Sequence, residues 1–239
     1  MTKKIYVFIG NYGSGKTELS LNIAMQSAGV CKTVLVDLDI INPYFRSSER
    51  RDMLEGMGVK LISPNFAMTN VDVPSLPPEV HSVFTGAYET VVFDVGGDAA
   101  GAVALGQYKR YFDNVPKTNL EVLFVINPRR PLSETPEMAL DLLENIKSKS
   151  RLDITGLVNN SNLSMETSAD DLLDGFEMVK SVSNKTMIPV SYTAGRQDVL
   201  NEFLKIAEEK GLDRNYIGKP FPIRTYMHRD WDSFLAHGI

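Results

Sequence analysis

Eight consecutive residues near the N-terminus combine glycines, a lysine and hydroxyl side chains in a pattern suited to holding a polyphosphate. They are Gly10, Asn11, Tyr12, Gly13, Ser14, Gly15, Lys16 and Thr17. The glycines permit positive φ angles and close backbone approach, so several N–H groups can point at one phosphate. Lys16 would reach the terminal phosphates as a point charge, and the Thr17 hydroxyl would join the coordination shell of a Mg²⁺ ion. We therefore predict that all eight residues bind nucleotide, that Lys16 is also catalytic, and that Thr17 is a metal ligand.

The segments on either side of these residues support that prediction. An apolar run at 5–9 precedes them as a strand would, and residues 16–28 have helical spacing. A helix that begins near Lys16 directs its partial positive charge toward a bound anion. Gly-x-x-x-x-Gly-Lys-Thr between a strand and a helix is the Walker A motif, or P-loop. The sequence thus predicts binding of a nucleoside triphosphate with Mg²⁺; the alternative is a glycine-rich turn that binds nothing.

Aspartates close two further apolar runs. In an open α/β sheet the working residues gather at the carboxyl ends of the strands. Asp37 and Asp39 end one run and share a side if that strand continues through them. Asp94 ends another and is followed by Gly96 and Gly97. Such carboxylates can hold Mg²⁺ and orient an attacking water, while a glycine N–H can sense the terminal phosphate. We predict Asp39 and Asp94 as catalytic residues, Asp37 and Asp94 as metal ligands and Gly97 as nucleotide-binding, with turn capping as the alternative for Asp37 and Asp39.

Apolar runs rich in Val, Ile, Leu and Phe recur along the whole chain and alternate with helical spacing. The runs cover 3–9, 33–38, 59–62, 90–95, 120–126, 154–159 and 187–192. The helical segments cover 16–28, roughly 45–57, 98–112, 134–149, 168–183 and 197–210, with Ser133 and Ser168 as candidate N-caps. Strands of this kind are buried on both faces. We predict a doubly wound, mainly parallel α/β sheet with helices on both faces.

The organisation of the chain predicts one nucleotide-binding domain over residues 1–239. No Gly/Ser-rich linker or internal repeat marks a second domain. Four prolines at 64–78 predict a loop near the nucleotide. The tail, 218–239, carries Trp231, Phe234 and Leu235 at helical spacing, but it is not basic. We therefore expect the tail to dock on the body of the protein or on a partner subunit rather than on a membrane.

Composition narrows the possible partners and locations. A net charge of −5 and a pI near 5.3 argue against a broad nucleic-acid-binding surface. With Cys31 as the single cysteine, we expect no intramolecular disulfide and no Fe–S cluster within one subunit, which suits a cytoplasmic location. No apolar run reaches bilayer length, so no transmembrane segment is expected.

The order of these motifs resembles the SIMIBI class of P-loop proteins, which includes MinD/ParA, the nitrogenase iron protein, CobQ/CobB and dethiobiotin synthetase. Residues 36–40, Val-Asp-Leu-Asp-Ile, are similar to the switch I strand end of MinD, which implies that Asp39 positions the hydrolytic water. Residues 94–98, Asp-Val-Gly-Gly-Asp, are similar to switch II of the nitrogenase iron protein. This likeness implies that Asp94 and Gly97 respond to the γ-phosphate.

Residues 156–161, Gly-Leu-Val-Asn-Asn-Ser, resemble the adenine-contacting segment of the same protein, which implies that Asn160 contacts the base. Segments 188–190 and 195–197 would then form the other wall of the base pocket. An Asn amide offers the donor and the acceptor that an adenine edge requires; an ordinary loop Asn is the alternative. The Asn-Lys-x-Asp pattern that recognises guanine is absent, because Asn184, Lys185 and Thr186 are followed by Met187 instead of an aspartate. ATP is therefore favoured over GTP.

Two departures from the family bear on function. Asn11 stands where MinD/ParA proteins have a second lysine that reaches the partner's nucleotide, which argues against that form of activation across a dimer. Ala100-Gly101 stands where a cluster-binding cysteine of the nitrogenase iron protein would fall, so electron transfer through a shared Fe–S cluster is not expected. We predict a slow, Mg²⁺-dependent ATPase, a hydrolase of the MinD/ParA-like class that switches with nucleotide and has a protein partner or forms a homodimer.

Two other functions stay open. One is an ATP-dependent ligase or kinase like dethiobiotin synthetase, acting on a small anionic metabolite. Three features favour a ligase or kinase: Asn11 in place of the second lysine, the proline-rich loop at 64–78, and two adjacent arginines, Arg129 and Arg130, which could hold an anion. The other is a nucleotide sensor that does not hydrolyse its ligand.

Overall fold

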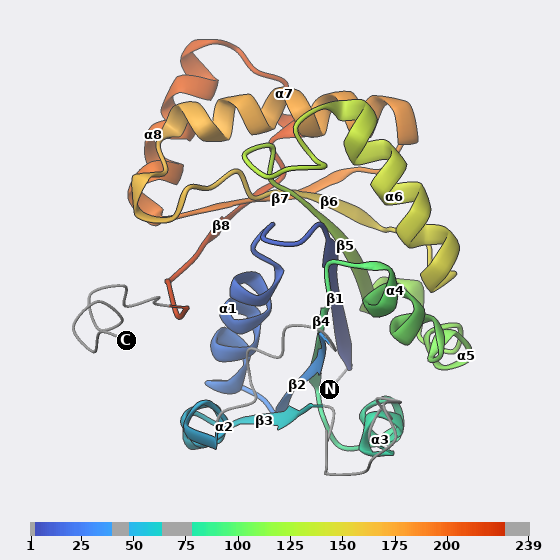
Figure 1. Cartoon of the computed structure of the whole chain (residues 1–239). Helices are drawn as coiled ribbons and strands as arrows, with labels where there is room; N and C mark the ends of the chain where they lie inside the picture. Colours follow the sequence, from blue (N-terminus) through green and yellow to red (C-terminus); the bar gives the residue numbers. More distant parts are fainter. Residues whose placement is uncertain (1–2, 40–47, 64–77, 228–239) are drawn as a thin grey trace, which may run out of the picture.

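A computed structural model describes residues 3–39, 48–63 and 78–227, and its centre is one sheet of eight parallel strands (Figure 1). The strands are β1 (Lys4–Gly10), β2 (Thr33–Leu38), β3 (Val59–Ile62), β4 (Thr90–Val95), β5 (Leu120–Ile126), β6 (Gly156–Asn159), β7 (Val190–Gly195) and β8 (Lys219–Pro222). Their order across the sheet is β3-β2-β4-β1-β5-β6-β7-β8. The predicted parallel α/β fold is confirmed, and β1, with the glycine-rich segment after it, lies in the middle of the sheet.

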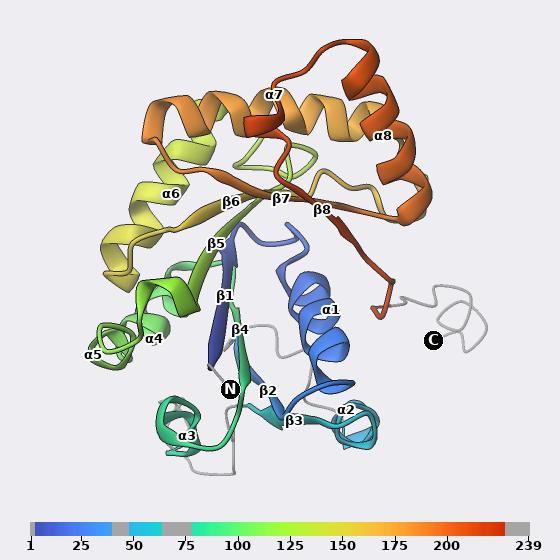
Figure 2. The ribbon, with the colours of Figure 1, turned by 180° about the vertical axis from the view of Figure 1, so that it is seen from behind.

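Helices cover both faces of this sheet. They are α1 (Lys16–Ala28), α2 (Ser48–Gly56), α3 (Glu79–Thr85), α4 (Ala99–Gly106), α5 (Lys109–Phe112), α6 (Pro136–Ser150), α7 (Ala169–Thr186) and α8 (Gln197–Glu209), with 3-10 turns η2 (Lys117–Asn119), η3 (Ser164–Glu166) and η4 (Arg214–Tyr216). In Figure 1, and from behind in Figure 2, α1 and α2 lie on one side of β1, β2 and β4, and α3, α4 and α5 lie on the other. The central strands are thus enclosed between two helical layers.

Alternate residues of each strand supply two separate cores, which explains the continuous apolar runs. Phe8, Leu35 and Val92 pack in the core beneath α1. Phe93 and Phe124, which point the other way, pack in the core beneath α4 and α6. A smaller core joins α7 to α8. Because both faces of the sheet are buried, the acidic side chains of Asp37 and Asp94 stand out among its buried strand residues.

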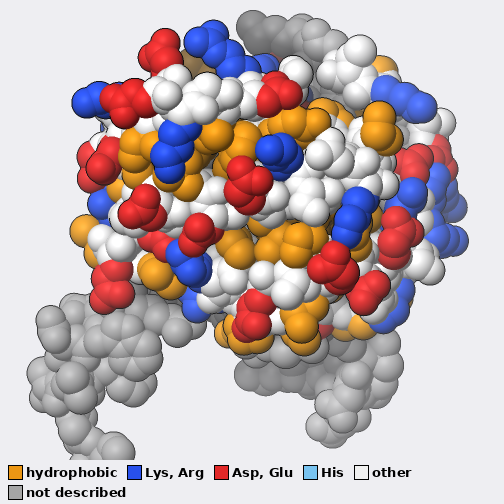
Figure 3. All heavy atoms as spheres, turned by 90° about the horizontal axis from the view of Figure 1, so that it is seen from above, with side chains coloured by type: hydrophobic (Ala, Val, Ile, Leu, Met, Phe, Trp, Pro, Cys, Tyr) orange, Lys and Arg blue, Asp and Glu red, His pale blue; other side chains and the backbone are white. Residues whose placement is uncertain are grey.

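The outer surface near α7 and α8 carries charges of both signs (Figure 3). Lys180 lies 3.7 Å from Glu177 on α7, and Lys205 lies 3.9 Å from Glu209 on α8. Exposed pairs of this spacing stabilise a helix by only about 0.3–0.5 kcal/mol each. Hydrophobic side chains lie between these charges on the same face (Figure 3). In the described ranges no helix has the length and apolar content needed to cross a bilayer.

The described elements correct three boundary predictions. The segment 98–112 forms two helices, α4 and α5, rather than one. Gly106, the last residue of α4, lies close to the end of α6: a Cβ there would lie 2.8 Å from the Lys149 carbonyl oxygen. The seventh strand begins at Val190 rather than 187. Thr135 caps α6, whereas the predicted cap Ser133 is buried beneath the loop before it. Ser168 caps α7 as predicted.

Two described elements, α3 and β8, were not predicted, and parts of other predictions lie outside the described residues. Residues 64–77 of the predicted loop, the start of the 45–57 helix and residues 228–239 of the tail belong to that undescribed part. The described tail adds β8 to the edge of the sheet beside β7. It then runs along α1, where the Asn22 side chain accepts from the Arg224 backbone N–H at 2.8 Å and donates to its carbonyl at 2.9 Å.

Candidate nucleotide site

The segment between β1 and α1 has backbone geometry that only glycine supplies. Gly10 has a φ of 146°, Gly13 of 71° and Gly15 of 92°. A Cβ on Gly10 would lie 2.5 Å from the Val125 carbonyl oxygen, and one on Gly15 would lie 2.2 Å from the amide nitrogen of Asn160. The segment is thus a tightly wrapped loop, in which the Tyr12 N–H donates to Asn11 Oδ1 at 2.8 Å and the Ser14 N–H donates to the Asn11 carbonyl at 3.2 Å, and α1 begins at its end.

Lys16, the first residue of α1, buries its ammonium group beside this loop. The side chain is almost fully enclosed, and its Nζ donates to the Asn11 carbonyl at 2.7 Å. Burial lowers the pKa of the Lys16 ammonium, while the carboxylates of Asp94 and Asp39 act in the opposite direction. A buried ammonium requires anionic partners. The predicted lysine and both predicted catalytic aspartates therefore lie in one electrostatic environment.

Asp94 is fully buried at the end of β4. Burial raises the pKa of this carboxyl to about 6, although hydrogen bonds from Thr17 and Ser20 and the charge of Lys16 oppose the shift. Asp37 lies directly beside it, since Asp37 and Asp94 are paired in the register of β2 and β4. The predicted metal ligands Thr17, Asp37 and Asp94 thus meet at the carboxyl edge of the sheet.

These oxygen ligands fit Mg²⁺ when the ion is also bound by phosphate. Mg²⁺ in nucleotide sites is held by one or two protein oxygens together with phosphates and water. Among the residues that the structure describes, no group of three or more His, Cys, Asp or Glu side chains gathers around one point. The hydroxyl of Thr17 and the carboxylates of Asp37 and Asp94 would bind the ion together with the phosphates of the nucleotide.

The ends of β2 and β4 contact the loop and one another. The Asp39 backbone N–H donates to Asp37 Oδ1 at 2.8 Å. The Asp39 carboxylate lies against Gly96, where a Cβ would be 3.3 Å from its Oδ1. A Cβ on Gly97 would lie 2.4 Å from the backbone nitrogen of Tyr12. The backbone after Asp94 therefore packs directly on the phosphate-binding loop.

Asn160 follows β6 and supports the loop from the other side. Its Nδ2 donates to the Ser14 carbonyl at 2.7 Å. Its Oδ1 and the Ser14 hydroxyl are buried and have no hydrogen-bond partner among the described residues. Buried polar atoms normally have partners, so two unsatisfied ones at a glycine-lined loop are what a site for a polar ligand would show. The adenine contact of Asn160 stays a prediction.

The segment 127–133, after β5, forms a further wall of the site. Its two arginines were expected to hold an anion there, but its contacts with the phosphate-binding loop were not predicted. Asn11 Nδ2 donates to the Pro131 carbonyl. Arg130 Nε donates to the Gly13 carbonyl at 3.1 Å. The signal that could have found this wall is Asn127, a buried polar residue directly after a strand, as Asn160 is.

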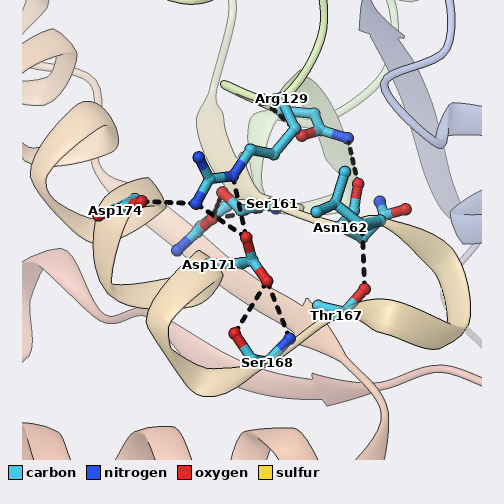
Figure 4. A network of polar contacts seen from close by, with 10 residues as sticks. Arg129, Ser161, Asn162, Thr167, Ser168, Asp171 and Asp174 are labelled. Carbon is cyan, nitrogen blue, oxygen red and sulfur yellow. Dashed lines mark hydrogen bonds and ion pairs between the residues drawn. The ribbon is translucent and has the colours of Figure 1, made fainter.

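Arg129 points away from the loop, so the predicted pair of anion-binding arginines is separated (Figure 4). Its Nε donates to Asp171 Oδ1 at 2.9 Å, and its terminal nitrogen lies 2.6 Å from Asp174 Oδ2. Burial would raise the pKa of Asp171, but hydrogen bonds from Ser168 and Arg129 outweigh it and lower the pKa overall. Arg129 therefore ties the segment after β5 to the start of α7.

The predicted base-pocket walls lie at two different edges of the sheet. Gly195 ends β7 at the same edge as the phosphate-binding loop, and Arg196 next to it donates to the Met165 carbonyl at 2.9 Å. Residues 188–190 lie at the amino end of the parallel strand β7, so their predicted contact with the base is wrong. Only the segment after β7 remains a candidate wall.

An all-parallel α/β sheet, a glycine-rich loop between β1 and α1, and carboxylates at the ends of the adjacent strands together define a P-loop α/β protein. This fold agrees with the SIMIBI class that the motifs resemble. No protein-family model matches the sequence, and no curated protein matches it.

Solved structures of similar fold include several signal recognition particle receptors. FtsY from Elizabethkingia anophelis is 17% identical over 83% of this chain and 61% of that one, with a TM-score of 0.49. The same receptor in complex with GDP is 18% identical over 81% and 58% of the two chains, with a TM-score of 0.49. Chloroplast FtsY from Physcomitrella patens is 17% identical over 81% and 59%, with a TM-score of 0.49. This chain thus spans about three fifths of their length, and the likeness concerns fold alone.

Proposed function

We propose that this protein binds ATP with Mg²⁺, hydrolyses it slowly and acts as a nucleotide-dependent switch. The observation that carries the proposal is the buried Lys16 ammonium, enclosed between a glycine-lined loop and the carboxylates of Asp94 and Asp39. A lysine in this position is well placed to neutralise the terminal phosphates of a nucleotide.

Each predicted site residue has a role in that reaction. The loop N–H groups and Lys16 hold the phosphates, while Thr17, Asp37 and Asp94 hold Mg²⁺, which neutralises phosphate charge. Asp39 would orient a water molecule for attack on the terminal phosphorus. A bond from the water oxygen to phosphorus forms as the bond from phosphorus to the bridging oxygen breaks, so that ADP and inorganic phosphate leave.

The contacts of Asn160 support adenine over guanine. Because its Nδ2 already donates to Ser14, the Oδ1 is the atom left for a base. An amide oxygen accepts from the N6 amino group of adenine, whereas guanine presents a carbonyl oxygen at that position. We therefore propose that ATP is preferred over GTP.

The packing of Gly97 on Tyr12 and of Asp39 against Gly96 supports the switch. A phosphate added to or removed from the loop would change contacts in the segments after β2 and β4, as in other switches that sense a γ-phosphate. The affinity for a protein partner, or for a second copy of the chain, that contacts these segments would change with the bound nucleotide.

The proposal is tested by Mg²⁺-dependent release of phosphate from ATP. We expect Lys16→Ala and Asp39→Asn to lower turnover at least 10-fold. The first removes the cation proposed to neutralise the phosphates, and the second removes the negative charge of the carboxylate proposed to orient the water. Lys149→Ala and Asp153→Asn, exposed residues remote from the loop, are the matched controls and should retain the wild-type rate. Undiminished turnover in both site variants would exclude this mechanism.

A ligase or kinase that acts on a small anion is the second candidate. The observation that favours it is a single arginine, Arg130, whose guanidinium lies beside the loop without a carboxylate partner among the described residues. Such an enzyme would release ADP many-fold faster when its acceptor is added and would give a phosphorylated product by mass spectrometry. If a broad screen of small carboxylates and alcohols gives neither result, the switch remains the better proposal.

A further inference from the structure

We infer that Arg130 binds the phosphate chain of a nucleotide held in its own subunit, which makes it a binding residue that the Walker A motif does not include. The inference rests on the proposed function, because it assumes that the loop between β1 and α1 holds a nucleoside triphosphate.

The position of the Arg130 side chain carries the inference. Its Nε donates to the Gly13 carbonyl at 3.1 Å. A Cβ on Gly13 would lie 3.5 Å from both Cδ and Nε of the arginine. The side chain therefore lies across the middle of the phosphate-binding loop, in contact with the backbone that would surround the phosphates.

Most of the guanidinium is still available for a ligand. Nε is used by Gly13, but the two terminal nitrogens have neither a hydrogen bond nor an ion pair among the residues that the structure describes. A guanidinium presents its donors in a planar fork that matches phosphate oxygens. An arginine held at this place is therefore prepared to donate two hydrogen bonds to an anion.

The neighbouring residue shows that this freedom is particular to Arg130. Arg129 belongs to the same turn, but its guanidinium is engaged by Asp171 and Asp174 (Figure 4). One arginine of the pair thus fixes the turn to α7, while the other extends toward the loop. The division of roles also explains why the two side chains do not share one anion.

The turn that presents Arg130 is held in place before any ligand binds. The Arg130 N–H donates to the Asn127 carbonyl at 3.1 Å, and the buried Ser133 hydroxyl donates to the same carbonyl at 2.8 Å. Pro131 restricts the backbone on one side, and its carbonyl accepts from Asn11, a residue of the loop itself. Because the backbone is fixed and Nε is already bonded to the Gly13 carbonyl, less conformational entropy is lost when phosphate is bound than for a free arginine.

This arrangement supplies a second positive charge to the site from the same chain. Lys16 approaches from the start of α1, and Arg130 approaches from the segment after β5. Of the two, Lys16 also offsets part of the charge of Asp94 and Asp39. A partner subunit is therefore not needed to bring a second cation to the phosphates.

Calorimetric titration of the full chain with ATP and with AMP, in the presence of Mg²⁺, tests the inference. We expect Arg130→Ala to weaken ATP binding about 10- to 100-fold, the range for charge-assisted hydrogen bonds of about 1.5–3 kcal/mol, and to change AMP binding far less. Arg130→Lys, which keeps the charge without the fork, should lose an intermediate factor. Arg214→Ala, at an exposed position in η4 before the amino end of β8, is the matched control and should leave the ratio of ATP to AMP affinity unchanged.

Thermal unfolding of each variant separates binding from folding. The inference is overturned if Arg130→Ala binds ATP within twofold of the wild type, or if ATP and AMP weaken equally. It is also overturned, in favour of an acceptor site, if only the KM for a second anionic substrate rises. Wild-type protein that binds ATP, with affinity lost in Lys16→Ala but kept in Arg130→Ala, would leave the proposed function standing while this inference fails. Wild-type protein that binds no ATP would remove both.

Discussion

Asp94 is a carboxyl group whose protonation and burial are linked. Burial raises its pKa to about 6 from the ordinary value of 3.8. The folded protein therefore binds more protons than the unfolded chain between about pH 4 and pH 6. The free energy of unfolding consequently falls as the pH rises through this window, by about 3 kcal/mol from this group alone, since one pKa unit corresponds to about 1.4 kcal/mol.

This linkage predicts the effect of Asp94→Asn on the metal-free, nucleotide-free protein. The amide keeps the shape of the carboxyl group but cannot ionise, so we expect the variant to gain stability relative to the wild type as the pH rises from 4 to 6. The gain should then stay constant toward pH 7.5. Urea unfolding of both proteins in a chelator at several pH values measures it. A stability difference that does not depend on pH would show that Asp94 ionises normally in the fold.

At the scale of elements, Arg129 connects the segment after β5 to α7 through two carboxylates that differ in burial. The Asp171 side chain is 8% exposed and also accepts from the Ser168 N–H at 2.9 Å at the start of α7, whereas Asp174 is 61% exposed. Removing one partner from a buried, hydrogen-bonded pair costs far more than weakening an exposed pair.

We therefore expect Asp171→Asn to lower the free energy of unfolding by about 1–3 kcal/mol, and Asp174→Asn by less than about 1 kcal/mol. The pKa of Asp171 is lowered in the fold, so its contribution is complete above the pKa of the unfolded chain and is lost as the pH falls. Urea unfolding at pH 7 and in acid tests both statements. Equal losses in the two variants would mean that burial does not set the strength of this connection.

The same scale shows which parts of the fold and site could be predicted from sequence. Strands β2, β3, β4 and β5 match their predicted ranges because burial on both faces makes each a continuous apolar run. The edge strand β8 escapes this signal, since it contains Pro220 and Pro222 and buries only Phe221. The predicted single helix over 98–112 is divided into α4 and α5 at Gln107 and Tyr108, a division that local spacing does not mark.

The site, like the fold, has parts that local sequence predicts and parts that depend on distant contacts. The loop at 10–17 and the strand-end carboxylates are local patterns, so the sequence predicts them directly. The different roles of Arg129 and Arg130 depend on contacts with Asp171 and Gly13, which are 42 and 117 residues away along the chain. From the sequence alone, two adjacent arginines look alike. Only the folded structure shows which partner each of them has.

At the scale of the whole molecule, the parallel sheet brings the ends of β1, β2, β4, β5 and β6 to one edge, and the described end of the chain returns to the helix that starts there. Glu18, directly after Thr17, accepts from the Tyr226 N–H at 2.6 Å and from the Met227 N–H at 3.1 Å. One turn later, Asn22 exchanges two hydrogen bonds with Arg224. Residues separated by 202 to 209 positions are thus joined on α1, next to the phosphate-binding loop.

Asn22→Ala tests how far this return of the chain stabilises the molecule. The variant removes both partners of the Arg224 backbone, so we expect faster hydrogen exchange at residues 224–227 and a loss of about 1–3 kcal/mol in the free energy of unfolding. Gln26→Ala, an exposed position one turn further along α1, is the control and should change neither. Faster exchange confined to 224–227, with unchanged global stability, would mean that the end of the chain opens independently of α1. Unchanged exchange would mean that Asn22 does not hold it, and that β8 and Glu18 are sufficient.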